Sequence, residues 1–272
     1  MSFPFAANLS FLFTELPWER RFAAAARAGF AGVEMNPPFP YKVAPAEFAR
    51  RLAEEGLACP LISAPPGDAD ARFGHACLPG AAADFRRSVD RMIDYAVTAA
   101  VPLGHVLAGL APEGVSRPAA EAAYVENLAW AAEQCAAADI ELCVEPVSEL
   151  RVPGFFLKTT AQALELIARA GCDNIGLLFD SFHVEVQEGS AAGALPALLP
   201  HVAHVQLSDT PARGRPGTGG IDFDAIFDLL EGHGYRGWIG CEYVPDPSRP
   251  DELDWARGWR RAAQADGSGV EA

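Results

Sequence analysis

Eight short apolar segments alternate with helix-like stretches along the 272 residues of this chain. The segments are FAANLS (5–10), GVEM (32–35), ACPLIS (58–63), GHVLAG (104–109), ELCVEP (141–146), IGLLFD (175–180), HVAHVQLSD (201–209) and GWIGCEY (237–243). They are rich in Val, Ile, Leu and Phe, as buried strands are. Eight β–α units in about 250 residues are typical of a TIM barrel. The sequence therefore predicts an α/β fold, a single-domain (β/α)8 TIM barrel.

A doubly wound open sheet is the alternative way to arrange alternating strands and helices. Such a sheet usually carries a Gly-rich phosphate turn after its first strand, but FAANLSFLF contains no GxGxxG pattern. No linker rich in Gly and Ser divides the chain, so we predict one domain over residues 1–263. A last helix is expected from about Asp251, and the tail QADGSGVEA (264–272) is predicted to be disordered.

Three of the predicted connections are long and contain several Gly and Pro residues. They follow the third, fifth and seventh strands and are APPGDADARFGHACLPG, VSELRVPGFFLKTT and TPARGRPGTGGID. In a TIM barrel the loops that follow the strands build the active site at the C-terminal face. We therefore expect these loops to form the walls of a site for a small-molecule substrate.

Four apolar segments end in a polar side chain of a kind that binds metals. These side chains are Glu145, Asp180, Gln206 and Glu242. Because they end successive strands of the predicted barrel, they are expected to meet at one rim. Alternation along each strand supports this, since the residues two positions earlier share the inward face. Those residues are Cys143, Leu178, His204 and Gly240.

Three carboxylates and one amide oxygen form a set of hard oxygen ligands. Such a set suits Mg²⁺ or Mn²⁺ better than Zn²⁺, which favours histidine and cysteine. Without a cation, the carboxylates would repel one another and at least one pKa would rise. Each acid taken alone could equally be a solvated strand end or a partner in a structural salt bridge. Their recurrence at four corresponding strand ends favours a common site.

Histidine and arginine side chains near these strand ends are candidates for substrate contact. His183 follows Asp180 closely, so it is either a hydrogen-bond donor to substrate or an ordinary loop residue. Arg213 and Arg215 lie in the loop after Gln206, where either could hold an anionic substrate or face solvent. The remaining candidates are His105, expected to face the interior and line the pocket, His204, expected to be a hydrogen-bonded interior residue, and His75, which is ambiguous.

Composition and charge exclude several classes of protein. The formal net charge is −15, which disfavours binding to nucleic acid. The six cysteines form no CxxC pair, and we expect them to be reduced in a cytoplasmic protein. The N-terminus does not resemble a signal peptide, and no apolar run is long enough to span a membrane. No GxSxG elbow, P-loop or HExxH motif is present.

Six motifs, taken in order, resemble the hydroxypyruvate isomerase family. They are AANLSFLFTE, PPGD with the following LPG, EPVSELRVPGFFL, FDSFH, HVQLSDTPARGRPGTG and GWIGCEY. This family is a branch of the xylose-isomerase-like TIM barrels that also contains 2-oxo-tetronate isomerases and sugar 3-epimerases. The resemblance extends from about Phe5 to Tyr243.

The resemblance implies a site and a reaction. A divalent metal ion, Mg²⁺ or Mn²⁺, would be held by Glu145, Asp180, Gln206 and Glu242, and the two glutamates would also act as acid and base. His183 and Arg213 match family positions that contact substrate. The implied reaction isomerises a small hydroxy-keto acid, hydroxypyruvate to tartronate semialdehyde, through an enediolate. A 2-oxo-tetronate isomerase or a ketose 3-epimerase with the same site is the alternative, and a homo-oligomer is expected.

The predicted walls of the site depart from the family pattern. VEMNPPFPY differs from the usual VEFxFPY, EPVS replaces EPIN, Ser63-Ala64 replaces an Asn, and Gly220 replaces a glutamate. The exact substrate therefore stays open. Two other classes of function are disfavoured. An endonuclease for abasic DNA would need a His-rich zinc cluster where Gln206 stands, and a silent sugar-acid-binding protein would not need the acid/base pair.

Overall fold

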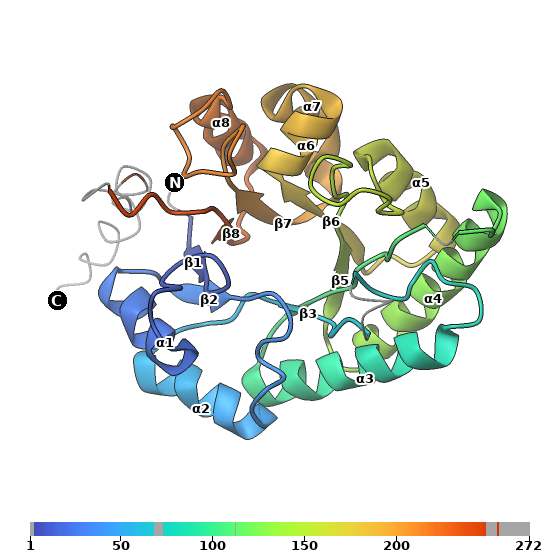
Figure 1. Cartoon of the computed structure of the whole chain (residues 1–272), viewed down its shortest axis with the longest axis horizontal. Helices are drawn as coiled ribbons and strands as arrows, with labels where there is room; N and C mark the ends of the chain where they lie inside the picture. The colour runs from blue at the N-terminus through green and yellow to red at the C-terminus, as the bar shows by residue number, and fades with distance from the viewer. Residues whose placement is uncertain (1–2, 68–72, 112, 249–254, 256–272) are drawn as a thin grey trace, which may run out of the picture.

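A computed structural model describes residues 3–67, 73–111, 113–248 and 255 of the chain. It confirms the predicted TIM barrel: parallel strands form the centre and helices surround them (Figure 1). The strands are β1 (Phe5–Asn8), β2 (Gly32–Glu34), β3 (Leu61–Ser63), β4 (Leu103–His105), β5 (Glu141–Val144), β6 (Ile175–Asp180), β7 (Val202–Leu207) and β8 (Ile239–Cys241). Each corresponds to one of the eight predicted apolar segments.

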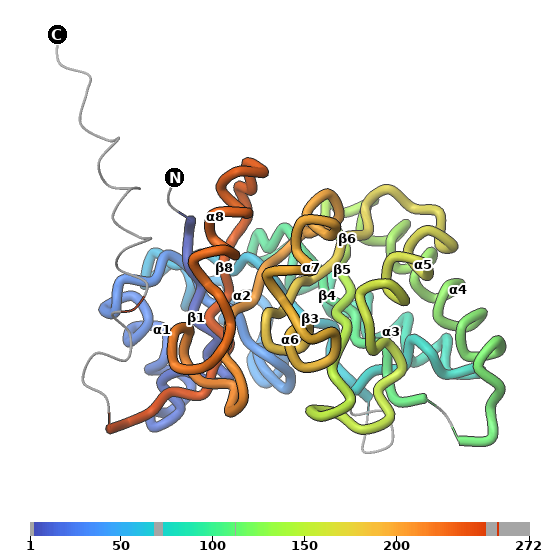
Figure 2. The backbone as a smooth tube through the Cα atoms, turned by 90° about the horizontal axis from the view of Figure 1, so that it is seen from above, coloured from blue at the N-terminus to red at the C-terminus, as the bar shows by residue number. Residues whose placement is uncertain are grey.

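The strands pair in the order β2-β1-β8-β7-β6-β5-β4-β3, with all pairs parallel. β1 pairs with β8, so the first and last strands of the chain lie side by side (Figure 2). Among the described residues β2 and β3 share no ladder, and one bridge joins Gly32 of β2 to Ala58, just before β3, where Val33 N donates to the Ala58 carbonyl at 2.8 Å. The barrel is therefore nearly closed, with a thin seam at this position.

The helices are α1 (Trp18–Arg27), α2 (Pro45–Glu55), α3 (Ala82–Ala99), α4 (Arg117–Ala136), α5 (Thr160–Ala170), α6 (Ser181–Glu188), α7 (Ala191–Leu198) and α8 (Phe223–His233). Local signals account for several boundaries. Thr159 caps α5 by accepting from Gln162 N, and α2 begins with a proline at its first position. Among the described residues, no helix combines the length and apolar character that a membrane span requires.

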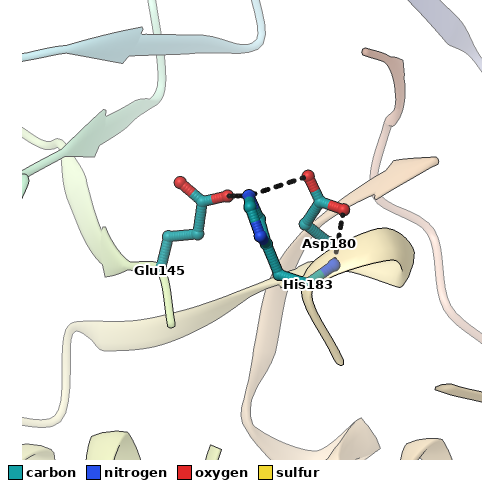
Figure 3. A group of neighbouring side chains, drawn as sticks. All are labelled: Glu145, Asp180 and His183. Atoms are coloured by element: carbon teal, nitrogen blue, oxygen red, sulfur yellow. Dashed lines mark hydrogen bonds and ion pairs between the residues drawn. The ribbon is translucent and has the colours of Figure 1, made fainter. Parts of the chain in front are cut away.

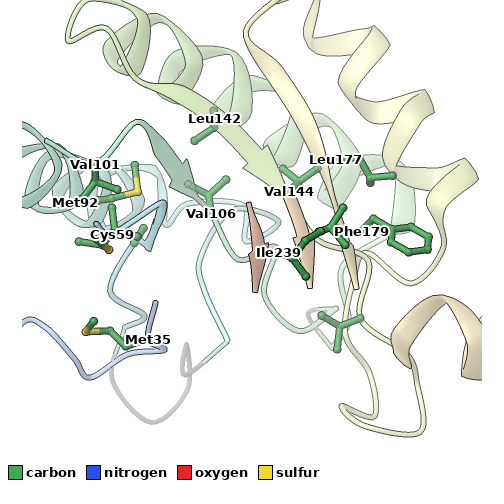
Figure 4. Close-up of a cluster of buried hydrophobic side chains, with 14 of the residues drawn as sticks. Met35, Cys59, Met92, Val101, Val106, Leu142, Val144, Leu177, Phe179 and Ile239 are labelled. Carbon is green, nitrogen blue, oxygen red and sulfur yellow. The ribbon is translucent and has the colours of Figure 1, made fainter. Parts of the chain in front are cut away.

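The main hydrophobic core lies between the strands and the surrounding helices. Val144, Leu177 and Phe179 belong to it and project outward from β5 and β6 (Figure 4). A second, smaller cluster consists of Leu61, Leu103, Cys143 and Leu178. Cys143 and Leu178 alternate with the outward residues, so this cluster fills the inside of the barrel. The predicted inward face of β5 and β6 is confirmed.

Two features differ from the sequence prediction or lie beyond it. The sequence pattern predicts one helix after β6, from about Ala191 to Leu199, but the structure has α6 directly after the strand as well as α7. The helix expected near Asp251 and the tail 264–272 fall almost entirely outside the described residues. The domain boundary at residue 263 stays a prediction.

Candidate active site

The four predicted strand-end side chains lie at one end of the barrel. Asp180 and Gln206 are register partners in the β6–β7 pair, while Glu145 and Glu242 directly follow β5 and β8. Glu145, Gln206 and Glu242 line a cavity of about 240 Å³, and the loops after the strands complete its walls. A cavity of this size suits a small metabolite, since sites for drug-sized ligands are larger. Its apolar lining includes Phe11, Leu107 and Phe155.

The acidic side chains of this site are crowded and withdrawn from water. Burial, together with the charges of Asp180 and Glu242, raises the pKa of Glu145 well above its ordinary value. Burial also raises the pKa of Glu242 to about 7, although Arg213 opposes the shift. Glu242 can therefore hold or release a proton near neutral pH, as an acid/base catalyst must, and the raised pKa of Glu145 favours its protonated form.

Arg213 carries the positive charge at the centre of the site. Its Nη2 lies 2.7 Å from Asp180 Oδ2 and 3.0 Å from Glu242 Oε1, and the side chain is buried. Its guanidinium also stacks over the rings of Phe11 and Phe182. Burial disfavours the charged form, but the neighbouring carboxylates outweigh it and raise the pKa of Arg213. The guanidinium thus balances the negative charges of Asp180 and Glu242.

His183 lies in the first turn of α6 and not in a loop. Asp180 Oδ1 accepts from the backbone N–H groups of Phe182 and His183, which starts the helix directly at the strand end. Nε2 of His183 lies 3.7 Å from Glu145 and 3.9 Å from Asp180 (Figure 3). These three residues form a group whose potential ligand atoms all lie within 4.8 Å of one another.

The protonation state of His183 follows from its surroundings. Its Nε2 lies 2.9 Å from Arg213 Nη1 and accepts from it, because a guanidinium can only donate. The proton of the neutral ring is therefore on Nδ1, which lies 3.0 Å from Ser148 Oγ. Burial lowers the pKa of His183 to about 4, and the charges of Arg213 and Arg151 contribute. The neutral ring of His183 is thus tied to the Arg213 guanidinium at the edge of the cavity.

His105 presents a second polar atom at the cavity. Its Nδ1 lies 3.0 Å from Ser63 Oγ, and among the described residues its buried Nε2 has no hydrogen-bond partner. Burial lowers the pKa of His105 to about 3, so the ring is neutral at physiological pH. Nε2 is 3.8 Å from Glu145 Oε2, within reach of anything bound beside that carboxylate.

A buried carboxylate in β2 fixes the orientation of Gln206. Glu34 Oε1 accepts from Gln206 Nε2 at 2.9 Å, and Glu34 Oε2 lies 2.9 Å from His204 Nε2. The amide nitrogen of Gln206 is thereby held away, and its oxygen is the atom left for the cavity. His204 is the hydrogen-bonded interior residue that the sequence predicted.

Two asparagines hold Glu242 in place. Asn36 donates to Oε1 at 3.1 Å and Asn8 donates to Oε2 at 3.2 Å. Asn8 ends β1 and Asn36 follows β2, so the first two strands support a side chain from the last one. A carboxylate with both oxygens in hydrogen bonds keeps a defined orientation.

The chemistry of the predicted donor set suits a divalent metal ion that prefers oxygen, while the acids and histidine gathered within 4.8 Å of one another are Glu145, Asp180 and His183. Glu145, Asp180 and Glu242 supply carboxylates, and Gln206 supplies an amide oxygen whose orientation is fixed by Glu34. The raised pKa values of the two glutamates reflect an excess of negative charge that a cation would relieve. Arg213 shares oxygens of Asp180 and Glu242, so these contacts must adjust when a cation binds.

The sequence analysis found most of this site but missed its supporting residues. The predicted residues Glu145, Gln206, Glu242, His105, His183 and Arg213 line the cavity, whereas Asp180, Arg215 and His75 do not. Asp180 lies beside the cavity and is paired with Arg213. Glu34 was overlooked, although it ends the second strand just as the predicted acids end theirs. Asn8 and Asn36 were also missed, and their polar positions at the ends of β1 and β2 carry the same signal.

Comparison with known proteins agrees with the fold and the site. Residues 22–264 match the family described as Xylose isomerase-like TIM barrel. The chain therefore belongs to that family. It is 38% identical over 257 residues to hydroxypyruvate isomerase of Escherichia coli (strain K12), covering 94% of this chain and 99% of that protein. It is also 38% identical over 254 residues to 2-oxo-tetronate isomerase of Cupriavidus necator, covering 93% and 97%.

These relatives place the chain in the hydroxypyruvate isomerase branch, and the protein is an isomerase. Among solved structures, one named AP endonuclease, family 2, from Brucella melitensis matches with a TM-score of 0.90 at 35% identity, covering 96% of this chain and 100% of that chain. An L-ribulose 3-epimerase matches with a TM-score of 0.76 at 24% identity, which shows a shared fold. In the part of the chain that the structure describes, the candidate ligand group contains a single histidine.

Proposed function

We propose that this isomerase acts on a small hydroxy-keto acid, converting hydroxypyruvate to tartronate semialdehyde through an enediolate. The observation that carries the proposal is the pair Glu145 and Glu242, two buried carboxyl groups with raised pKa values that line one small cavity. Relatives named hydroxypyruvate isomerase and 2-oxo-tetronate isomerase support this substrate class.

The proposed reaction moves one hydrogen between adjacent carbons. One glutamate removes a proton from the hydroxymethyl carbon, and a proton is returned to the former carbonyl carbon. The hydroxyl proton passes to the former carbonyl oxygen, so atoms and charge balance. A divalent cation held by Glu145, Asp180, Gln206 and Glu242 supplies Lewis-acid stabilisation of the charge that develops on oxygen.

The remaining polar groups of the cavity bind the substrate oxygens in this proposal. His183 lines the cavity with a neutral ring that Ser148 holds at Nδ1, and its Nε2 orients the Arg213 guanidinium. His105 offers an Nε2 that has no partner among the described residues. The apolar side chains of Phe11 and Phe155 limit the access of water to the enediolate. Arg213 balances negative charge beside Asp180 and Glu242.

Proton NMR in D₂O tests the proposal directly. Protein treated with chelator and resupplied with Mg²⁺ or Mn²⁺ should form tartronate semialdehyde from hydroxypyruvate and incorporate deuterium. Glu145→Gln and Glu242→Gln should each lower kcat by about 10²- to 10⁴-fold, because each removes an acid/base group. Circular dichroism checks that both variants keep the fold. Full turnover in both variants would refute the assigned roles.

A second substrate of the same class is 2-oxo-tetronate, which relatives at 37–38% identity are named for. The same assay with both acids ranks them by kcat/KM.

The homo-oligomeric state and cytoplasmic location also remain proposals. Light scattering after size-exclusion chromatography tests the first of these, and cell fractionation tests the second.

A further inference from the structure

Arg151 stands at the wall of the active-site cavity on the loop that follows β5. Its backbone N–H donates to the Ser148 carbonyl at 3.0 Å, closing a turn. The neighbouring Glu149 N–H donates to Gln187 Oε1 at 3.0 Å, which ties the same turn to α6. The position of Arg151 is therefore fixed by the frame that also holds His183, through Ser148.

The two arginines that line the cavity differ in how their charge is used. Arg213 is buried and paired with Asp180 and Glu242. Arg151 is exposed, and among the described residues its guanidinium has no hydrogen bond or ion pair. Arg151 is thus the cavity-lining arginine whose fork of N–H donors is available in the described part of the chain.

We propose that Arg151 binds the carboxylate of the substrate and so selects hydroxy-keto acids over neutral hydroxy ketones. This assignment rests on the proposed function. Glu145, Asp180 and Glu242 would repel an anionic substrate, so a cation at the wall is needed to hold the acid group. A guanidinium pairs with a carboxylate through two parallel hydrogen bonds, which also fixes the substrate's orientation.

Arg213 is less suited to this task because of its existing contacts. Turning toward a substrate carboxylate would leave Asp180 and Glu242 buried without a partner, which is costly. Arg151 has no hydrogen bond or ion pair of its guanidinium to give up among the described residues. The two arginines therefore divide the work: Arg213 balances the protein's own acids, and Arg151 recognises the acid of the substrate.

Steady-state kinetics with a matched pair of substrates tests the proposal. Hydroxypyruvate carries the carboxylate, and dihydroxyacetone replaces it with a hydroxymethyl group. In Arg151→Gln we expect KM for hydroxypyruvate to rise about 10- to 100-fold, as for loss of a charged hydrogen bond. Deuterium exchange into dihydroxyacetone should stay unchanged, and Arg151→Lys should recover part of the lost affinity.

Arg20→Gln is the control, because it removes the same charge from an exposed position on α1 outside the cavity lining. An unchanged KM in Arg151→Gln would overturn the proposal. Equal losses with both substrates would also overturn it, because they would indicate a structural role for the turn.

Calorimetric binding of glycerate, a non-reacting acid, separates this proposal from the proposed function. If the wild-type protein fails to isomerise hydroxypyruvate but Arg151→Gln loses glycerate affinity, the proposed isomerase function is refuted and carboxylate recognition by Arg151 is supported. If isomerisation occurs but Arg151→Gln changes neither glycerate binding nor the KM for hydroxypyruvate, the role of Arg151 is refuted and the proposed function is supported.

Discussion

Arg213 combines an unusual backbone with an unusual environment. Its φ is 57°, in the left-handed region that costs a residue with a side chain about 1–2 kcal/mol. Glycine would relieve this cost but would leave Asp180 and Glu242 without their shared partner. The strained backbone is therefore retained for the sake of the guanidinium, as happens at functional sites.

The glutamates make a prediction about pH. In the metal-free protein the pKa of Glu242 is about 7 and that of Glu145 is also raised, whereas unfolded glutamate titrates near 4.3. A carboxyl group with a raised folded-state pKa contributes stability that is complete below the unfolded pKa. That stability is lost as pH rises through the folded pKa. We therefore expect the metal-free protein to lose stability between about pH 5 and pH 8, by at most about 1.4 kcal/mol per pH unit for each proton.

Urea unfolding at several pH values measures this slope. Glu242→Gln cannot titrate, so its stability should fall less steeply over the same range. Saturating Mg²⁺ or Mn²⁺ should also flatten the slope, because the metal takes the place of the protons. A stability that rises with pH across this window would contradict the expected charge crowding.

Single residues show what the sequence could and could not reveal. Glu145, Asp180 and Glu242 could be predicted because an acid at the end of an apolar run is conspicuous. Glu34 ends a short strand in the same way, but its partners His204 and Gln206 are far away in the chain. Residue type and position alone did not separate Arg213 from Arg215; the family resemblance pointed to Arg213, and the folded loop shows that Arg213 is the buried one.

At the level of elements, the alternation of side chains along each strand positions the proposed ligands. The space inside the barrel beside Gly240 is small. A methyl group on Gly240 would overlap a carboxylate oxygen of Glu34 and lie 2.9 Å from Gln206 Cγ. Gly240→Ala should therefore destabilise the protein by about 1–3 kcal/mol, as overpacking does. It should also weaken metal binding, because Glu34 and Gln206 must move. Chemical unfolding and metal titration measure the two effects.

Gly232→Ala in α8 provides the matched control. An added methyl group there meets nothing within 4 Å. Alanine is the better helix former, so this variant should be more stable by about 0.5–1 kcal/mol and should bind metal normally. Equal behaviour of the two variants would contradict the tight contact inside the barrel.

The elements also show where sequence patterns stop being informative. The strands were predictable because each is a concentrated apolar run. α6 was not, because its start depends on Asp180, whose carboxylate both faces the site and accepts from two backbone N–H groups of the helix. Asp180 ends a strand, caps a helix and lies at the site, but its sequence pattern indicates only the end of the strand.

For the whole molecule, metal binding should be linked to stability. The proposed ligands meet only in the folded barrel, so Mg²⁺ or Mn²⁺ should stabilise the native state by about 2.7 kcal/mol at 100 times Kd. Thermal unfolding with and without chelator measures the shift in Tm. The Tm of Asp180→Asn should shift less on adding metal than the Tm of the wild-type protein. An identical wild-type Tm with and without metal would argue against a metal site in the folded state.

The barrel as a whole was predictable from the count and spacing of its segments, but its seam was not. In the described part of the chain, β2 is joined by one bridge, at Gly32, to Ala58 just before β3, whereas every other pair of adjacent strands forms a ladder. Pairing depends on the paths of the backbones, which apolar composition does not encode. Sequence thus gives the architecture, and the structure gives its uneven closure.

Glu34 links parts of the chain that are 170 residues apart, from β2 to His204 in β7. All four proposed metal ligands come from β5 to β8, so the C-terminal half of the barrel would carry the complete coordination sphere. That half by itself would lack the carboxylate that keeps the Gln206 amide from turning over. The two halves are therefore not interchangeable modules, and a chimera that exchanges one half must preserve the Glu34 contact to retain an aligned site.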